Sequence, residues 1–326
     1  MKDGYLLTIK NLVTRFDTEA GEIRAVDDVS FDLKKGEILG LVGESGSGKS
    51  VTGFSIMGLI DEPGRIHSGQ IHFKGEDLTK VSPVRYQDIR GKEIAMIFQD
   101  PMMTLNPVLR IDTQIIESIQ AHERVSTAKA RERARDALGM VGISSPEQRL
   151  RAYPHQFSGG MRQRVVIAIA MLHSPDIIIA DEPTTALDVT IQAQILHEMQ
   201  KLRATRDMSI IWITHDLSVI SALADRVCVM YAGNLVESGS IDDVLDQPLH
   251  PYTKGLIESV PSRNVVGRPL AQIRGMMPTM INPPPGCRFQ DRCDYSQEDC
   301  SRNPQMSNLP LERQVRCHHP VSRDTP

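Results

Sequence analysis

The clearest candidate for chemistry in this chain is a glycine-rich loop at positions 43–50, which reads GESGSGKS. It matches the pattern G-x-x-x-x-G-K-S/T, in which backbone N–H groups cradle phosphates. We therefore predict nucleotide binding, with Lys49 reaching the β- and γ-phosphates and the Ser50 hydroxyl holding Mg²⁺. The residues expected to contact the nucleotide are Gly43, Ser45, Gly46, Ser47, Gly48, Lys49, Ser50 and Val51.

The segments on either side of the loop fit this interpretation. Residues 38–42, ILGLV, are typical of a buried strand, and residues 51–59 carry apolar side chains at helical spacing without a proline. A strand, a loop and a helix in this order direct a helix N-terminus at the phosphates. The context favours a phosphate-binding loop over an ordinary Gly/Ser turn.

Two adjacent carboxylates, Asp181 and Glu182, follow the apolar run 177–180. A carboxylate at the C-terminal end of a strand beside a phosphate loop can coordinate Mg²⁺, and we assign this role to Asp181. Glu182 can then polarise the water that attacks the γ-phosphate. The alternative is a strand end that carries two solvated acids.

A further helix start lies at residues 157–164, FSGGMRQR. Small residues at a helix start leave backbone N–H groups available for an anion, which makes Ser158, Gly159 and Gly160 candidates for phosphate binding. A plain helix cap by Ser158 would explain the same pattern.

Composition narrows the class of protein. The chain has 326 residues, 40% of them hydrophobic and 24% charged, as is ordinary for a soluble globular protein of one large domain or two. A net charge of −4 gives no support to a nucleic-acid partner. No apolar stretch approaches the roughly 20 residues that cross a bilayer, and the charged N-terminus lacks a secretory pattern. We expect an intracellular protein that does not span the membrane.

Short apolar runs alternate with helical patterns, which predicts a parallel sheet covered by helices on both faces. The expected strands are residues 38–42, 94–98, 177–180, 210–214 and 227–231, and an amphipathic helix is expected at 190–205. Residues 1–35 and 66–78 alternate like antiparallel strands, whereas 110–172 are mostly helical in pattern.

Prolines mark a change of character near residue 260. Pro261, Pro269, Pro278 and the run 283–285 cannot belong to helix interiors, so they predict an extended linker. We expect a nucleotide-binding domain at 1–260, with a helical subdomain at about 110–172, and a linker with a cysteine-rich tail at 261–326.

In their order along the chain, these motifs resemble those of the ATP-binding cassette ATPases. The distinguishing motif of that family, LSGGQ, appears here as Phe157–Met161, with the Ser-Gly-Gly core kept and both ends changed. The resemblance implies an α/β P-loop NTPase fold with a RecA-like parallel-sheet core, an N-terminal antiparallel β subdomain and a helical subdomain.

The resemblance also implies roles for four further residues. Phe16 corresponds to an aromatic that stacks on adenine, although an edge-strand core aromatic would look the same. Gln99 matches a glutamine that contacts Mg²⁺ and the attacking water, and His215 matches a histidine that contacts the γ-phosphate. Asp188, in Ala186-Leu187-Asp188, matches the loop that touches the opposite subunit. The implied catalytic residues are Glu182, His215 and Gln99.

Cassettes of this family pair head to tail, and each ATP lies between the phosphate loop of one subunit and the Ser-Gly-Gly core of the other. The resemblance implies a two-state switch in which ATP joins two subunits and hydrolysis releases them. A lone monomer should therefore hydrolyse ATP slowly.

Three segments are similar to the ATPase subunits of dipeptide, oligopeptide and nickel importers. They are residues 98–107, residues 181–190, and residues 250–253 with the proline-rich linker and Gly286–Phe289 behind them. This resemblance implies hydrolysis of ATP coupled to inward transport of di- or oligopeptides. Nickel chelates or glutathione-like substrates, an exporter, and a non-transport ATPase in DNA repair or on ribosomes are the alternatives.

The same resemblance implies partners and a location. The chain would lie at the cytoplasmic face of the inner (plasma) membrane as a peripheral subunit, bound to two transmembrane permease subunits. A second, distinct cassette would complete a heterodimer, an external substrate-binding protein would deliver the cargo, and no nucleic acid would take part. Residues 100–110 would receive a short permease helix, unless they form an ordinary surface loop.

Four of the five cysteines, Cys287, Cys293, Cys300 and Cys317, lie in the last forty residues, whereas Cys228 sits in an apolar run and is expected in the core. In the cytosol such a cluster more often binds metal than forms disulfides. Its spacing, Cys-x5-Cys-x6-Cys-x16-Cys, differs from the Cys-x2-Cys of structural zinc.

Four thiolates suit either a 4Fe-4S cluster or Zn²⁺, and His318 and His319 add a Cys/His option for zinc. Importers of this branch can carry an iron–sulfur cluster in this tail, so the resemblance favours the cluster. Four unligated thiols are the remaining alternative.

Overall fold

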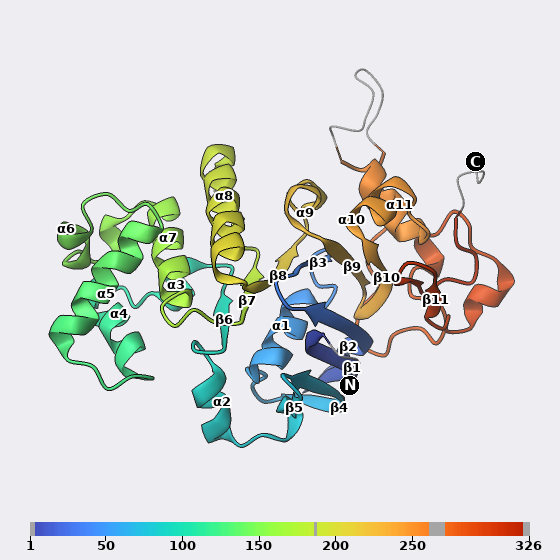
Figure 1. Ribbon diagram of the computed structural model, residues 1–326. Helices are drawn as coiled ribbons and strands as arrows, with labels where there is room; N and C mark the ends of the chain where they lie inside the picture. Colours follow the sequence, from blue (N-terminus) through green and yellow to red (C-terminus); the bar gives the residue numbers. More distant parts are fainter. Residues whose placement is uncertain (1–3, 186–187, 261–270, 322–326) are drawn as a thin grey trace. The chain divides into compact units, whose positions relative to one another are not determined.

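The computed structural model describes residues 4–185, 188–260 and 271–321. The chain divides into two compact units, one formed by Met1–Lys80 with Trp212–Pro326 and the other by Val81–Ile211 (Figure 1). Two of the predicted linker prolines, Pro261 and Pro269, lie outside the described residues, as do Ala186 and Leu187 of the expected subunit-contact loop.

The first unit begins with the antiparallel sheet that the sequence predicts. Its strands are β1 (Tyr5–Thr18), β2 (Gly21–Lys34), β4 (Gly64–Phe73) and β5 (Glu76–Asp77), in the order β2-β1-β4-β5. Alternate side chains such as Leu7 and Ile9 are buried, which is the pattern that gives the sheet one core face. A 3-10 helix, η1 (Leu78–Lys80), follows β5.

A parallel core also belongs to this unit. Strand β3 (Ile38–Val42) is buried at every residue and pairs in parallel with β9 (Arg226–Tyr231). Helix α1 (Lys49–Met57) follows β3, and helix α9 (Leu217–Leu223) follows β8 (Ser209–Thr214). Continuous apolar runs are typical of strands that are buried on both faces, so the sequence located these strands correctly.

The expectation of a purely parallel sheet was incomplete, because antiparallel strands extend it. Strand β10 (Asn234–Ser240) pairs antiparallel with β9, and β12 (Arg313–Val315) and β11 (Ser307–Leu309) continue from β10. The cause is a two-residue turn at Ala232 and Gly233, whose φ angles are 45° and 83°. Two positive φ values in succession are those of a tight hairpin turn.

The remaining elements of the first unit lie toward the C-terminus of the chain. Helices α10 (Ile241–Asp246) and α11 (Pro251–Glu258) follow β10, and the cysteine-rich segment contributes two 3-10 helices, η4 (Gln290–Arg292) and η5 (Glu298–Ser301). The C-terminal segment therefore belongs to the same unit as the N-terminal strands, and its hairpin of β11 and β12 extends the sheet that contains β10, β9 and β3.

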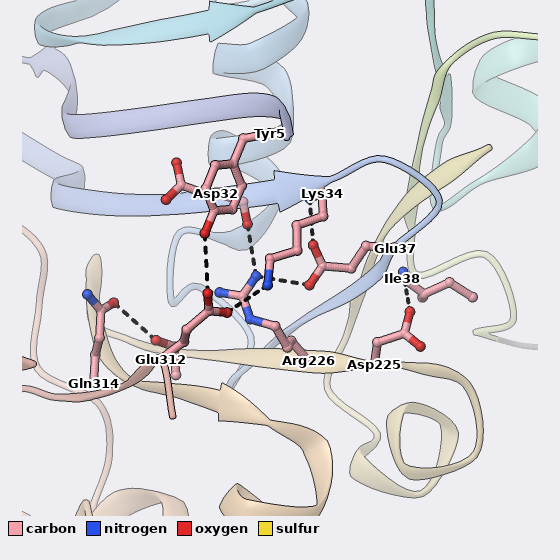
Figure 2. A network of polar contacts seen from close by, with 10 residues as sticks. Tyr5, Asp32, Lys34, Glu37, Ile38, Asp225, Arg226, Glu312 and Gln314 are labelled. Carbon is pink, nitrogen blue, oxygen red and sulfur yellow. Dashed lines mark hydrogen bonds and ion pairs between the residues drawn. The ribbon is translucent and has the colours of Figure 1, made fainter. Parts of the chain in front are cut away.

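Polar contacts hold that hairpin against the N-terminal strands (Figure 2). Glu312, in the turn between β11 and β12, accepts from Lys34 Nζ at 2.7 Å and from the Tyr5 hydroxyl at 3.5 Å. Nearby, Arg226 of β9 donates to Glu37 Oε1 at 2.9 Å. The hydrogen bond from Lys34 and its positive charge hold the pKa of Glu312 below its usual range.

The second unit contains the predicted helical region and two parallel strands, β6 (Ile94–Ile97) and β7 (Ile177–Asp181). Its helices are α2 (Pro83–Ile89), α3 (Pro101–Thr104), α4 (Ile111–Gln120), α5 (Thr127–Met140), α6 (Pro146–Leu150), η2 (Pro154–Gln156), α7 (Gly159–Ala170) and α8 (Val189–Arg206). Among the described residues of either unit, none of the helices is both long and apolar enough to span a membrane.

Candidate functional site

The phosphate-type loop lies between β3 and α1, and its backbone requires glycine. Gly43 and Gly48 have φ angles of 156° and 100°. A Cβ at Gly43 would run into the carbonyl oxygen of Met230, and a Cβ at Gly48 into that of Ala25. Glycine at these positions therefore lets the loop pack directly against neighbouring backbone.

Lys49 is the first residue of α1, and only 4% of it is exposed. Its ammonium group donates to the carbonyl oxygens of Gly43 and Glu44, both at 2.9 Å, so the side chain lies along the inside of the loop. Gly48 begins the helix without a side-chain cap, which leaves the helix N-terminus suited to an anion. The Ser47 hydroxyl is buried and has no hydrogen-bond partner among the described residues.

Phe16 and His215 belong to the same unit as the loop. Phe16 is half-buried, and its ring lies so close to Gly64 that a Cβ there would come within 2.5 Å of it. Strand β1 lies between β2 and β4, so Phe16 does not lie on an edge strand. His215 directly follows β8 and is exposed.

In the second unit the structure brings together two residues that are far apart in sequence. Glu182 Oε2 accepts from Thr185 Oγ1 at 2.9 Å and from Gln99 Nε2 at 3.3 Å. Asp181, immediately before Glu182, ends β7 and is buried. The two side chains that were assigned to water and metal contacts, Gln99 and Glu182, are thus neighbours.

The backbone of Glu182 is also unusual. Its φ is 45°, in the left-handed region that residues with a side chain rarely adopt. Such a conformation costs roughly 1–3 kcal/mol and persists only where the surroundings enforce it. The hydrogen bonds from Thr185 and Gln99 hold the carboxylate in this orientation.

Ser158 and Asp188 both cap helices. Ser158 Oγ accepts from the Met161 N–H at 3.3 Å at the start of α7, which is the helix cap that the sequence offered as the alternative to phosphate binding. Asp188 Oδ1 accepts from the Ile191 N–H at 2.9 Å at the start of α8. A Cβ at Gly160 would come within 2.9 Å of Ile191, and this close approach accounts for the glycine.

A cavity of the second unit joins Gln99 to the start of α7. Its lining also includes Asp100, Gly159, Gln163 and Thr185. The Gln163 side chain is buried, and its Nε2 has no hydrogen-bond partner among the described residues. The sequence offered a signal for Gln163, since it lies in the segment 157–164, but no role had been assigned to it.

The C-terminal segment gathers its four cysteines around one small cavity. Cys287, Cys293, Cys300 and Cys317 all line it, together with His318 and His319. Burial raises the pKa of Cys287, and it raises the pKa of Cys317 to about 12. Cys228 lies elsewhere, fully buried in β9, as expected for a core residue.

The sequence missed two other polar residues of this region. Asp299 forms a hydrogen bond with His319, in which Asp299 Oδ1 lies 2.7 Å from His319 Nε2. The atoms of Asp299, Cys300 and His319 that could bind a metal lie within 4.8 Å of one another. His250 lines the cavity and is fully buried; burial lowers its pKa to about 3. Its neutral ring accepts the Tyr252 N–H at 3.0 Å.

Comparison with known proteins gives matches over both units. Residues 26–185 match the ABC transporter family, and residues 236–300 match the oligopeptide/dipeptide transporter C-terminal region. The dipeptide transport ATP-binding protein DppD of Bacillus subtilis is 51% identical over 298 residues, which cover 91% of this chain and 89% of that protein. The oligopeptide transport ATP-binding protein OppD of the same organism is 51% identical over 304 residues, covering 92% of this chain and 85% of that protein.

A solved structure agrees with the sequence matches. The dimeric post-hydrolysis state of the ATP-binding cassette MJ0796, bound to ADP and phosphate, aligns with a TM-score of 0.64 and 27% identity. The alignment covers 72% of this chain and 98% of that one.

Proposed function

Since this chain belongs to the ATP-binding cassette (ABC) family of transporter ATPases, we propose that it is the ATP-hydrolysing subunit of a peptide importer. The observation that carries the peptide assignment is the match of residues 236–300 to the oligopeptide/dipeptide transporter C-terminal region. Relatives that cover 91% and 92% of this chain are named for dipeptide and oligopeptide transport. The reaction is ATP + H₂O → ADP + phosphate, coupled to inward movement of di- or oligopeptides.

The proposed roles are those that the family resemblance implies for these residues. Lys49 would contact the β- and γ-phosphates from inside the loop, and Ser50, Gln99 and Asp181 would hold Mg²⁺. Phe16 stacks on adenine, and His215 contacts the γ-phosphate. Catalysis of phosphoryl transfer is mostly positioning and charge stabilisation, which suits a loop that glycine holds in place and a buried lysine.

Glu182 is the proposed residue that polarises the attacking water. The support is its strained backbone and the fixed direction of its carboxylate, which accepts hydrogen bonds from Thr185 and Gln99. Strain of this kind is concentrated at functional sites. A carboxylate that is already oriented needs little rearrangement when the water approaches.

A second, distinct cassette completes the proposed site. In a head-to-tail pair, Ser158, Gly159 and Gly160 of one chain face the ATP held by the phosphate loop of the other, and Asp188 contacts the opposite subunit. ATP then joins the two chains, and loss of the γ-phosphate weakens the contact. The helix N-terminus at α7 supplies N–H groups of the type that bind phosphate.

Residues 100–110 are the proposed docking surface for the permeases. The short helix α3 lies here, capped by Asp100, whose Oδ1 accepts from the Met102 N–H at 2.8 Å. Met103 is 80% exposed and Val108 is 75% exposed, so apolar side chains are presented at the surface. These side chains suit a short apolar helix of a permease at the cytoplasmic face of the membrane.

A pull-down from host membranes in mild detergent, followed by mass spectrometry, tests this function. We expect two multi-span permeases, a second cassette and the external substrate-binding protein to accompany the chain. Ribosomal or DNA-repair proteins without a membrane partner would support the ATPase activity alone and overturn the transport role.

The Met103→Asp variant should no longer bring down the permeases, because it places a charge on the proposed docking surface. Val84→Asp, which replaces another exposed apolar residue, should still bring them down.

The cysteine cavity would hold a 4Fe-4S cluster in this proposal. Four thiols that line one cavity are the ligand set of such a cluster. A single zinc ion holds its ligand atoms closer together than a 4Fe-4S cluster does, because each sulfur lies about 2.3 Å from the one metal. Among the described residues, the ligand atoms of Asp299, Cys300 and His319 lie within 4.8 Å of one another, and this mixed set is the one that the zinc alternative would use. When bound, the cluster would join segments that contain little regular structure of their own.

Cys293→Ser should remove the iron and the brown colour from anaerobically purified protein. The serine hydroxyl is a poor replacement for a thiolate ligand, so the cluster is lost or incompletely held. Iron and zinc analysis with the visible absorption spectrum measures the result, and Cys228→Ala, a cysteine outside the cavity, should keep both iron and colour. Wild-type protein that contains zinc and no iron would contradict the cluster.

A further inference from the structure

A buried arginine of the C-terminal segment is bound directly to the phosphate loop. Arg292 ends η4, and its side chain is 7% exposed. Its Nη1 donates to Glu44 Oε2 at 2.9 Å, and its Nη2 donates to Glu44 Oε1 at 3.0 Å. Glu44 is the second residue of the loop 43–50. A two-pronged pair of this geometry is among the stronger and more directional contacts in proteins.

The guanidinium of Arg292 is itself held from several sides. Its Nε donates to the carbonyl oxygen of Arg274 at 2.8 Å, and its Nη1 also reaches the Tyr231 hydroxyl at 3.2 Å. The guanidinium carbon lies 5.6 Å from the centre of the Tyr231 ring and 5.8 Å from that of Phe289. An arginine fixed in this way can impose its position on the carboxylate that it binds.

Glu44 is also fixed through its backbone. Its N–H donates to the Tyr252 hydroxyl at 2.9 Å, and its carbonyl oxygen accepts from Lys49 Nζ at 2.9 Å. The rings of Tyr252 and Tyr231 lie 4.6 Å apart, so the groups that bind Glu44 form one packed cluster. The C-terminal segment also approaches the loop at Gly46, where an added Cβ would lie 3.1 Å from the terminal methyl of Met277.

We propose that Arg292 is a positioning residue for the nucleotide, acting through Glu44. The inference rests on the proposed role of the loop in binding phosphates. Arg292 fixes the first turn of the loop through Glu44. Its positive charge also balances the Glu44 carboxylate, which would otherwise repel the negatively charged triphosphate. Without Arg292, the Glu44 carboxylate is left partly buried and unpaired beside that site, which is unfavourable for a second anion.

Arg292→Gln should raise the Kd for the non-hydrolysable analogue AMP-PNP about tenfold, within the range of coupling between neighbouring sites. Equilibrium titration of the purified full chain measures it. Because the effect depends on charge, the Kd for adenosine should change little. Arg292→Lys keeps the positive charge and loses the paired geometry, so its Kd for AMP-PNP should lie between those of the wild type and of Arg292→Gln. Arg302→Gln, at an exposed arginine of the same segment, is the matched control.

The double variant Arg292→Gln with Glu44→Gln separates positioning by charge from general damage to the fold. Removal of both charges should recover most of the affinity for AMP-PNP that the single Arg292→Gln variant loses. Equal loss for adenosine and AMP-PNP, or no recovery in the double variant, would overturn the inference.

Lys49→Ala in parallel distinguishes this inference from the proposed function. If Lys49→Ala abolishes binding while Arg292→Gln leaves the Kd within about twofold of wild type, a change too small to signify site coupling, only the inference fails. If neither substitution changes the Kd, the loop does not bind the nucleotide, and both fail.

Discussion

Glu182→Gln should leave ATP binding intact and lower ATP turnover by about 10³-fold, within the range attributed to a positioned acid–base group. The glutamine oxygen can still accept hydrogen bonds from Thr185 and Gln99, so the local structure is kept. The uncharged amide cannot polarise the attacking water as the carboxylate does. Phosphate release by the chain assembled with its partner cassette, in the presence of Mg²⁺ and ATP, measures the effect, and size-exclusion chromatography should show an ATP-bound dimer of the two cassettes that accumulates.

Glu132→Gln is the matched control, because Glu132 is an exposed glutamate of the same unit that pairs with Lys129 on α5. It should turn over ATP at the wild-type rate. Turnover of the Glu182→Gln variant close to wild type would remove Glu182 from its proposed role, whatever the geometry around it. A variant that fails to bind ATP would instead indicate a contribution of this carboxylate to the bound state.

Local patterns were sufficient for the parts of the fold that depend on neighbours in sequence. The buried strand at Ile38–Val42, the glycine-dependent loop and the helix from Lys49 follow from residue types within a short window. The same holds for the strand that ends in Asp181 and for the helical region of the second unit. The observed strand ends differ little from the predicted ones: β6 ends at Ile97, whereas the sequence pattern extended to residue 98.

Contacts between distant segments could not be read in this way. The hairpin turn at Ala232 and Gly233 lacks the Asn-Gly or Asp-Gly pair that usually announces one, so the antiparallel addition to the sheet was not foreseen. The bond from Arg292 to Glu44 joins residues 248 positions apart, and no periodicity encodes such a pair. Pairing of this kind is determined by tertiary packing.

The cysteines show both what the sequence pattern predicted and what it left out. Their clustering near the end of the chain was visible in the sequence, and it correctly indicated that they would gather. Of the residues around them, His318 and His319 were visible in the sequence, whereas Asp299 lies in no motif and His250 was noted only as part of residues 250–253. The prolines predicted a linker that leads to this tail, and the tail belongs to the same compact unit as the phosphate loop.

Lys49→Ala should raise the Kd for ATP at least about 100-fold, because charge-assisted hydrogen bonds contribute roughly 1.5–3 kcal/mol each and two or more are lost. The ammonium group is almost fully buried and already lies against the loop carbonyls of Gly43 and Glu44. Removing it takes away the contact to the phosphates and leaves two loop carbonyls without their donor. Equilibrium titration with AMP-PNP separates this loss of binding from a loss of turnover.

Two comparisons make the Lys49→Ala result specific. Lys10→Ala changes an exposed lysine of the same unit and should bind AMP-PNP as the wild type does. Glu182→Gln should bind ATP normally and fail in turnover, so the two variants should differ in the step that they affect. If Lys49→Ala bound AMP-PNP with the wild-type Kd, the loop would lose its assigned role, since a buried cation at the start of a helix is the feature that makes it a phosphate site.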